Sequence, residues 1–423
     1  MREKLTYLFL IVLIISSTAV VNAQKIDKKK VVTLALEQNR EIQKLKREIA
    51  KTEAQLNEAE GAFYPSLDLN TSYTRSEEPS QMTKSKDSYR VSLDLRQPLF
   101  LSGRLRLNYQ MVQNNLEMSK LSLEQKQEEI IYQVLEEYYN LLKAKKMLKV
   151  RQQQVEQNQR YVEVAKANKE VGTSTKTDLL QAKVSYNQAQ QDHLVAENNL
   201  QRAKLALKNT LNIADETRLE ISDSLKWEQE EFKLNELYND ALDNNISFKL
   251  LDLQKETAEL DLESKQKESI YPELNLTAGY ETNDQELTLE EGEWQTTLSL
   301  SYNLFNGGRD KDQIKQKEEE LAKVKIEEEE LKDNIRLAIE SALLDFRAAR
   351  DKINLNRLNL EQAAENLSDN EIKFQEGLIT SLDLLEVQTT YQQIKTQYYQ
   401  AIYDYNLALA ELNKAVGKIK EDY

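Results

Sequence analysis

Two long stretches without glycine or proline constrain this chain more than any other feature. The 423-residue sequence contains only 9 glycines and 4 prolines. None of them lies between Gly103 and Gly172, and none lies between Gly308 and Gly377. Each interval is long enough for one helix of about 100 Å, at about 1.5 Å per residue. Helices of that length cannot be buried in one compact core, so the sequence predicts long, solvated helices and disfavours a glycine-rich nucleotide-binding fold.

Charge and residue types exclude several functional classes. The formal net charge is −15, which disfavours general binding to nucleic acid or to an anionic membrane surface. The chain has no cysteine, so disulfides, thiolate metal sites and cysteine nucleophiles are excluded. His193 is the single histidine, and one chain therefore cannot build a catalytic triad or a histidine-rich metal site. We expect no enzyme activity and no bound cofactor or metal.

The N-terminus has the pattern of a secretory signal peptide. Arg2 and Lys4 form a basic segment, residues 8–15 are apolar, and residues 21–23 end in Ala23 as a small-residue cleavage site. A retained membrane anchor is the alternative, but the apolar run is short for a membrane span. We therefore predict a signal peptide over 1–23 and no transmembrane helix after it.

The rest of the sequence is an internal duplication, with an offset of 205 to 207 residues between the copies. A repeat this long predicts a pseudo-symmetric structure. We expect repeats at 24–212 and 237–417, a connecting segment at 213–236 and a short tail at 418–423. The motifs that match are Tyr64-Pro65 with Tyr271-Pro272, Leu99-Phe100 and Gly103-Arg104 with Leu304-Phe305 and Gly308-Arg309, and Gly172 and Asp178 with Gly377 and Asp383.

Each repeat shows the order helix, two strands, long helix, medium helix. Adjacent apolar pairs such as Ile130-Ile131 and Val134-Leu135 make a wide stripe, typical of a helix that contacts neighbours on both sides. We therefore expect helices packed side by side as a wall. The predicted helices are 31–61, 105–171 and 175–211 in the first repeat, and 237–269, 310–376 and 380–416 in the second.

Four segments alternate between apolar and polar residues as β-strands do. They lie at 67–73, 89–96, 273–280 and 294–302, and each is about long enough to cross a bilayer when tilted. Tyrosine or tryptophan at the strand ends suits an interfacial girdle, and the polar face suits a wet lumen. We expect strand boundaries at Pro65, Pro98, Pro272, Gly103 and Gly308.

A soluble amphipathic sheet lying on the helices is the alternative to membrane-spanning strands. The polar, acidic hairpin loops at 76–87 and 282–293 favour exposed loops instead. Four strands cannot close a barrel, since small barrels need at least about eight, and every strand edge inside a bilayer must be paired. Several copies would have to contribute strands to one barrel, and three copies would give about twelve.

The order and spacing of these motifs resembles the TolC-like family of outer membrane efflux proteins, over the whole chain after the signal peptide. The resemblance is carried by the duplication, the Tyr-Pro strand entries, the Leu-Phe-x-x-Gly-Arg strand exits and the Gly-x5-Asp-x-Leu turns. It implies a mainly α fold with a transmembrane β-barrel. In such a homotrimer, four strands per copy form a twelve-stranded barrel in the outer membrane of a Gram-negative bacterium, which continues as a long α-helical barrel through the periplasm.

The resemblance also implies a gate at the periplasmic tip. By position, Asp383 and Glu386 correspond to acids that ring the lumen, and such rings favour cations. Phe374 corresponds to an aromatic gate residue, whereas Ile379 replaces an arginine of the family's gating salt bridges. The alternative for Asp383 is an acid that complements the dipole of a helix start, as its copy Asp178 suggests.

The turns between the long and medium helices are candidate contacts for a periplasmic adaptor protein. Ordinary turn packing is the alternative for these residues. Those we single out are Gly172, Thr173, Ser174 and Asp178 in the first turn, and Gly377, Leu378, Thr380 and Ser381 in the second.

The function we expect is a passive export duct, opened at its tip by an adaptor and an inner-membrane pump of RND, ABC or MFS type. A periplasmic adaptor is one alternative, but it would need a membrane anchor and a glycine-containing β-domain. A structural coiled-coil tether is another, but it does not explain four alternating strands. Drugs, metals and proteins all remain open as cargo.

Overall fold

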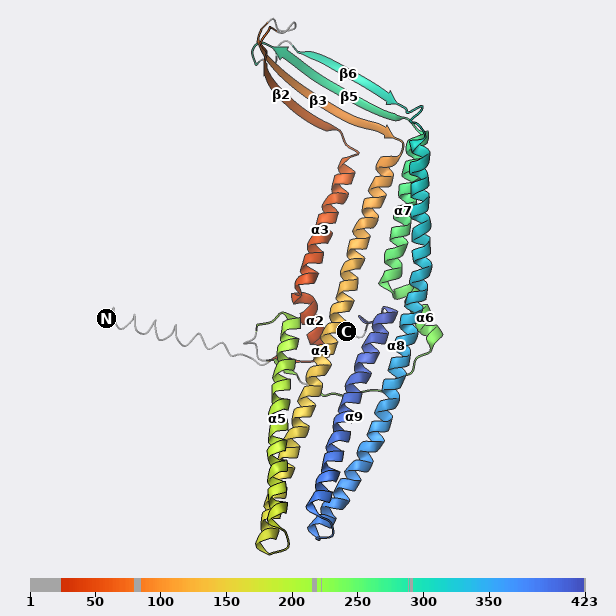
Figure 1. The fold of residues 1–423 in the computed structure, drawn as a ribbon. Coiled ribbons are helices and arrows are strands. Elements are labelled where there is room, and N and C mark those ends of the chain that lie inside the picture. The colour runs from red at the N-terminus through yellow and green to blue at the C-terminus, as the bar shows by residue number, and fades with distance from the viewer. Residues whose placement is uncertain are drawn as a thin grey trace, which may run out of the picture. The chain divides into compact units, whose positions relative to one another are not determined.

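The computed structural model describes residues 24–79, 85–214, 219–221, 223–287, 289 and 292–421. The predicted signal peptide, 1–23, therefore lies outside the described residues. In chain order the elements are β1 (Gln24–Ile26), α2 (Lys28–Gln38), α3 (Arg40–Gly61), β2 (Ser66–Arg75), β3 (Asp87–Leu101), α4 (Arg104–Glu170), α5 (Lys176–Leu211), β4 (Leu219–Ile221), α6 (Leu234–Asn244), α7 (Ile246–Ile270), β5 (Glu273–Asp284), β6 (Glu293–Ser301), α8 (Arg309–Gln375) and α9 (Ser381–Val416) (Figure 1).

The chain divides into two compact units. The first contains the described parts of Met1–Ile42, Lys126–Asn245 and Ile335–Tyr423. The second contains the described parts of Gln43–Gln125 and Ile246–Asn334. The four-stranded sheet belongs to the second unit, and the turns that join α4 to α5 and α8 to α9 belong to the first.

The long helices α4 and α8 have 67 residues each, and their bounds agree with the prediction within one residue. The glycines that flank them explain these bounds. Gly103 and Gly308 precede the helices with φ of 76° and 87°, and Gly172 and Gly377 follow them with φ of 81° and 75°. Residues with a Cβ rarely adopt this left-handed conformation, so glycine marks each helix end.

In the first unit, helices α5, α4, α9 and α8 pack side by side in that order (Figure 1). Arg151 of α4 lies 3.6 Å from Asp192 of α5. Lys352 of α8 pairs with Asp404 of α9 at 3.1 Å. An apolar stripe on α8 lies inside this layer, and all its members are buried: Ile335, Ile339, Leu343, Phe346 and Ala349.

The first helix of each repeat is broken, contrary to the prediction of single helices at 31–61 and 237–269. Helix α2 ends before Asn39, which is extended at φ −67° and ψ 129°, and α3 begins at the next residue. The Asn39 side-chain oxygen accepts a hydrogen bond from the Glu41 N–H at 2.8 Å, so it starts the new helix as a cap. Asn245 separates α6 from α7 with a similar backbone conformation, φ −64° and ψ 122°.

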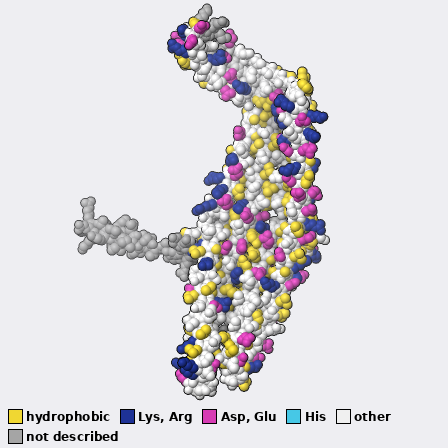
Figure 2. Space-filling model, viewed as in Figure 1, with side chains coloured by type: hydrophobic (Ala, Val, Ile, Leu, Met, Phe, Trp, Pro, Cys, Tyr) yellow, Lys and Arg dark blue, Asp and Glu magenta, His cyan; other side chains and the backbone are white. Residues whose placement is uncertain are grey.

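The second unit joins the sheet to helices that contact one another through polar side chains. Thr52 and Ser119 link α3 to α4 at 3.4 Å. Lys255 of α7 pairs with Glu328 of α8 at 2.9 Å. The hydrogen bonds from Lys332 and Lys255 together lower the pKa of Glu328 to about 2. On the face of the molecule seen in Figure 2, positive and negative side chains are interspersed along the helices.

Strands β2, β3, β5 and β6 form an antiparallel sheet in that order. Pro65 and Pro272 directly precede β2 and β5. Pro98 was expected at a strand boundary, but it lies inside β3, at a register shift in the pairing with β5. Proline has no N–H to donate to the ladder, so a bulge is where a paired strand can accommodate it. A second, parallel pair joins β1 to β4.

Among the described residues, none of the helices combines the length and the apolar character needed to cross a membrane.

Candidate functional site

Both turns between long and medium helices are built on the same capping box. The Asp178 N–H donates to the Thr175 hydroxyl at 3.2 Å, and the Thr175 N–H donates to the Asp178 carboxylate at 2.8 Å. Thr380 and Asp383 repeat this arrangement, with distances of 3.3 and 2.8 Å. The hydrogen bonds from Thr175 and Thr380 lower the pKa values of the two aspartates below the ordinary value. Both acids therefore have a local structural role as helix caps.

Glu386 lies one helical turn after Asp383 on α9, and both side chains are exposed. Within the described residues, no salt bridge or side-chain hydrogen bond involves the Glu386 carboxylate. A spacing of three residues places the two carboxylates on one side of the helix. Their predicted role in a lumen stays a prediction.

Two contacts join the tip of the α4–α5 hairpin to the tip of the α8–α9 hairpin. The Ser381 hydroxyl donates to the Asp178 carboxylate at 3.4 Å. The ring of Phe374 packs on Tyr161 with the centroids 5.5 Å apart. Leu384 completes an apolar cluster with Tyr161 at this end of the unit. Phe374 and Ser381 were expected at this tip from the sequence, whereas Tyr161 was not.

The turns themselves expose apolar residues at their ends. The Leu378 N–H donates to the Lys373 carbonyl at 2.8 Å and closes the end of α8 around Gly377. The Leu378 side chain is 68% exposed, and Val171 in the first turn is 74% exposed. Thr173 and Ser174 complete the first turn, and the N–H groups of both donate to the Asn168 carbonyl.

The four-stranded sheet has one apolar face and one polar face. Residues directly opposite each other in the ladder share a face, and successive residues alternate between faces. The register therefore collects these apolar side chains on one face: Leu67, Leu69, Leu93, Leu95, Leu276, Ala278, Leu298 and Leu300. The other face is polar and includes Asn70, Arg90, Ser92, Asp94, Thr277, Glu281 and Ser299.

Aromatic residues border the apolar face at both ends. Near the hairpin loops, Tyr73 packs on Tyr89 and Tyr280 packs on Trp294, each pair with centroids 5.0 Å apart. At the helix end, Phe100 packs against Tyr271 at 6.3 Å. An apolar band between two aromatic rows is the arrangement of strands that cross a bilayer.

The outer strands of this sheet each have one open edge. Within the described part of the chain, β2 pairs only with β3 and β6 pairs only with β5. Every residue of β2 and of β6 is exposed, whereas β3 and β5 are mostly half-buried. Open edges of this length invite pairing with another strand.

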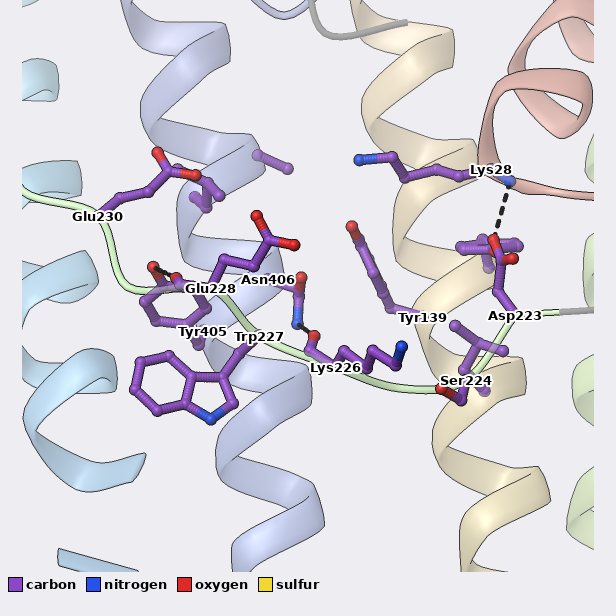
Figure 3. Close-up of a pocket in the computed structure, with 14 residues that line it drawn as sticks. Lys28, Tyr139, Asp223, Ser224, Lys226, Trp227, Glu228, Glu230, Tyr405 and Asn406 are labelled. Atoms are coloured by element: carbon purple, nitrogen blue, oxygen red, sulfur yellow. Dashed lines mark hydrogen bonds between the residues drawn. The ribbon is translucent and has the colours of Figure 1, made fainter. Parts of the chain in front are cut away.

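A cavity of about 530 Å³ lies in the first unit, where the connecting segment crosses α4 and α9. Figure 3 shows Lys28, Tyr139 and Glu228 around it. The Tyr405 hydroxyl donates to the Glu228 carbonyl at 2.5 Å, and the Asn406 amide donates to the Lys226 carbonyl at 2.9 Å. These bonds attach the connecting segment to α9. In the part of the chain that the structure describes, no cluster of three or more histidine, cysteine or acidic residues could hold a metal ion.

A sheet with a bordered apolar face and a polar reverse face, joined to long helical hairpins, is the construction of a membrane channel. Comparison with known proteins supports this class. The family model of outer membrane efflux proteins matches residues 31–212 and 237–418. The chain therefore belongs to the outer membrane efflux protein family, a family of channels and not of enzymes.

Characterised relatives have names that agree with this family. The outer membrane efflux protein BepC of Brucella suis is 24% identical over 376 residues, which cover 86% of this chain and 79% of that protein. The outer membrane protein TolC of Escherichia coli is 22% identical over 382 residues, which cover 86% of this chain and 77% of that protein. The protein is an outer membrane channel for efflux.

Solved structures share the fold at low sequence identity. The open-state MtrE outer membrane channel of Neisseria gonorrhoeae has a TM-score of 0.79 at 18% identity, covering 93% of this chain and 89% of MtrE. The CmeC outer membrane channel of Campylobacter jejuni has a TM-score of 0.78 at 15% identity, covering 93% of this chain and 86% of CmeC.

Proposed function

We propose that three copies of this chain assemble into a passive export channel in the outer membrane. The observation that carries the proposal is the amphipathic four-stranded sheet with two open edges. In a bilayer those edges must be paired, and four strands are too few to close a barrel. A homotrimer would supply about twelve strands, with the apolar face toward lipid and the polar face toward the lumen.

Apolar residues at the two edges of the helical layer support the same assembly. Helices α5 and α8 are the outer helices of the layer α5, α4, α9 and α8, and both carry large exposed apolar side chains. Monomeric proteins seldom leave such stripes uncovered, so a neighbouring helix is the simplest cover. The exposed residues are Leu180, Val184, Leu194, Val195 and Leu205 on α5, and Leu337, Leu344, Leu355, Leu358 and Ile372 on α8.

The channel would receive its cargo through partners at the hairpin tips. We propose that the turns around Gly172 and Gly377 contact a periplasmic adaptor protein, which connects the channel to an inner-membrane pump. Exposed Val171 and Leu378 offer apolar contacts there, and the polar residues of the turns offer hydrogen bonds. Exchanging both turns for glycine–serine sequences would abolish adaptor capture, whereas intact capture would contradict the contact.

The tip would also carry the gate. Three copies of Asp383 and Glu386 would place about six carboxylates around a narrow opening, which favours cations over anions. Phe374 would act there by holding the two hairpins of each copy together through Tyr161, at a centroid distance of 5.5 Å.

Removal of residues 1–23 would release the chain into the periplasm before assembly, with repeats at 24–212 and 237–417 and the connecting segment at 213–236.

The assembly can be tested on outer membrane fractions. We expect the protein in that fraction as a trimer that converts to monomers when the sample is boiled before electrophoresis. In planar bilayers the purified trimer should conduct ions. A monomer found only in the soluble periplasmic fraction would refute the proposed channel.

A further inference from the structure

The duplication of this chain holds at the level of single hydrogen-bonded residue pairs in the sheet. The Tyr-Pro motifs place the first strands of the two hairpins 207 residues apart, and the Gly-Arg motifs place the second strands 205 residues apart. With these offsets, the pair Leu67–Leu95 in the first hairpin corresponds to Leu274–Leu300 in the second. Leu274 and Leu300 are indeed paired, and every other pair of the second hairpin obeys the same rule.

The sheet also contains one junction between the two copies, where β3 pairs with β5. Asp94 lies opposite Gly279, Leu93 lies opposite Tyr280, and this register continues to Pro98 opposite Asn275. After the bulge at Pro98, Phe100 lies opposite Leu274. The second strand of one repeat thus pairs with the first strand of the next repeat in a defined register.

The two open edges of the sheet correspond to the two strands that meet in the internal junction, because β6 is the copy of β3 and β5 is the copy of β2. Within the described part of the chain, β6 is the second strand of its hairpin and has no first strand of another repeat beside it. In the same way, β2 is the first strand of its hairpin and has no second strand of another repeat beside it. A second copy of the chain would supply to each edge what the internal junction already contains. The same offsets then translate Asp94–Gly279 into Ser299 opposite Ser72 of the next copy.

The segment that follows β6 shows that this edge is incomplete in one chain. Strand β3 continues to Leu101, but its copy β6 ends at Ser301, five residues before the equivalent of Leu101. Leu304 and Phe305, which follow that end, are each 87% exposed. Their counterparts in the first repeat, Leu99 and Phe100, lie within β3 and are 50% and 43% exposed. The paired strand covers these residues in one repeat and is missing in the other.

We infer that β6 of one copy pairs antiparallel with β2 of the next, in the register of the internal β3–β5 junction, and that residues 302–306 extend β6 along this seam. The inference rests on the proposed trimeric channel and adds to it the residue pairs of the subunit interface. Leu298 then lies opposite Tyr73, Ser299 opposite Ser72 and Ser301 opposite Asn70. Past the bulge, Phe305 lies opposite Leu67.

The faces of the sheet agree with this register at every pair. Leu298 and Tyr73 both belong to the apolar face, and Ser301 and Asn70 both belong to the polar face. A slip of one residue would place apolar side chains opposite polar ones along the whole seam. A slip of two residues would keep the faces but lose the correspondence with the β3–β5 junction, so it is the alternative to test.

Disulfide cross-linking can distinguish these registers because the native chain has no cysteine. Directly opposed residues in an antiparallel pair have Cβ atoms about 4.5–5.5 Å apart, and diagonal neighbours are about 7–8 Å apart. A disulfide needs Cα atoms within about 4.4–6.8 Å. Ser299→Cys with Ser72→Cys tests the inferred register. Ser299→Cys with Asn70→Cys, and with Thr74→Cys, tests slips of two residues.

A fourth variant controls for the reactivity of the shared cysteine. Ser299 lies opposite Asn275 of its own chain, so Ser299→Cys with Asn275→Cys should form a disulfide within one chain. All four variants are oxidised with copper phenanthroline as trimers in outer membrane vesicles. Boiled, non-reduced samples are then separated by electrophoresis, and thiol loss in the control is measured by mass spectrometry.

We expect covalent dimers and trimers for Ser299→Cys with Ser72→Cys, at an initial rate at least about tenfold above either diagonal pair. Faster cross-linking of a diagonal pair would overturn the register while leaving the trimeric channel intact. Oxidation of the internal control without cross-links in any seam variant would overturn the β6–β2 pairing. A chain that is monomeric before oxidation would instead refute the proposed function itself.

Discussion

Leu384 is a buried residue of the apolar cluster that holds the two hairpin tips together. Its side chain is 4% exposed, and the cluster also contains Tyr161, Ala165, Ala182 and Leu367. These residues come from α4, α5, α8 and α9. Replacing Leu384 with alanine should therefore loosen the hairpin tips without touching the sheet.

The size of the effect follows from the atoms that are removed. Leu→Ala deletes about three buried carbon atoms, each worth about 0.8 kcal/mol of transfer free energy, or about 2.4 kcal/mol together. A residual cavity adds to this loss, and buried Leu→Ala substitutions cost about 2–5 kcal/mol. Since about 1.4 kcal/mol changes an equilibrium constant tenfold, local opening of the tip should increase at least about 50-fold.

Native-state hydrogen exchange on the purified trimer measures this opening directly. Amide protection in the first three turns of α9 should fall at least about 50-fold in Leu384→Ala. The matched control is Leu382→Ala, because Leu382 lies two residues earlier and is 63% exposed. A surface change of this kind should alter protection by no more than about twofold. Equal protection in the two variants would refute the role of the cluster.

Three further outcomes are expected. Replacing Asp383 by Asn and Glu386 by Gln should weaken the block of bilayer currents by trivalent cations, and unchanged block would contradict their place in the lumen. Thr175→Ala should cost α5 about 1 kcal/mol near neutral pH, measured by amide exchange at its start. Hydrogen bonds lower the folded-state pKa of Asp178, so the stability contributed by this cap is present above the ordinary aspartate pKa of about 3.9 and is lost as the pH falls through the lower folded value. The difference in stability between the variant and the native chain should therefore shrink at low pH. A difference that stays constant with pH would argue against this role of Asp178. Tyr138→Phe removes a hydrogen bond to a carboxylate of the connecting segment, worth about 1.5–3 kcal/mol, and should speed tryptic cleavage of that segment; an unchanged rate would contradict the anchor.

The sequence predicted the long helices and the hairpins because their signals are local. A glycine with positive φ at a helix end, and alternation along a strand, depend on neighbouring residues. The breaks at Asn39 and Asn245 were missed, although an asparagine side chain can cap a helix and so compete with its continuation. The parallel pairing of β1 with β4 had no such signal, because three-residue strands about 195 residues apart leave no periodic pattern.

The candidate site was predictable only where it is local. The capping role of Asp383 was an alternative from the sequence, because Asp178 stands at the same place in the other repeat, and the structure shows the cap. The contacts of Ser381 with Asp178 and of Phe374 with Tyr161 join residues about 200 positions apart. They depend on how α4 and α8 pack beside α9, which residue spacing alone does not determine.

The ends of the medium helices show that the two repeats are no longer interchangeable parts. Asn212 and Gly417 occupy the same position and both have positive φ, 53° and 80°. The Asn212 side chain donates to the Gln38 carbonyl at 3.2 Å, and so bridges α5 to α2. At Gly417 the backbones themselves meet, since a Cβ would lie 2.9 Å from the Asn244 carbonyl.

The second junction excludes the arrangement of the first. An asparagine at 417 has no room, and the bridge in that repeat runs from Asn245 to the Ala415 carbonyl at 3.1 Å instead. Recombination between the duplicated halves would therefore have to exchange the end of the medium helix together with the short helix that it meets. In each repeat, the end of the medium helix and the short helix that it meets form a matched pair, and the two pairs have diverged from each other. The internal symmetry of the chain is preserved in the strands more strictly than at these helix junctions.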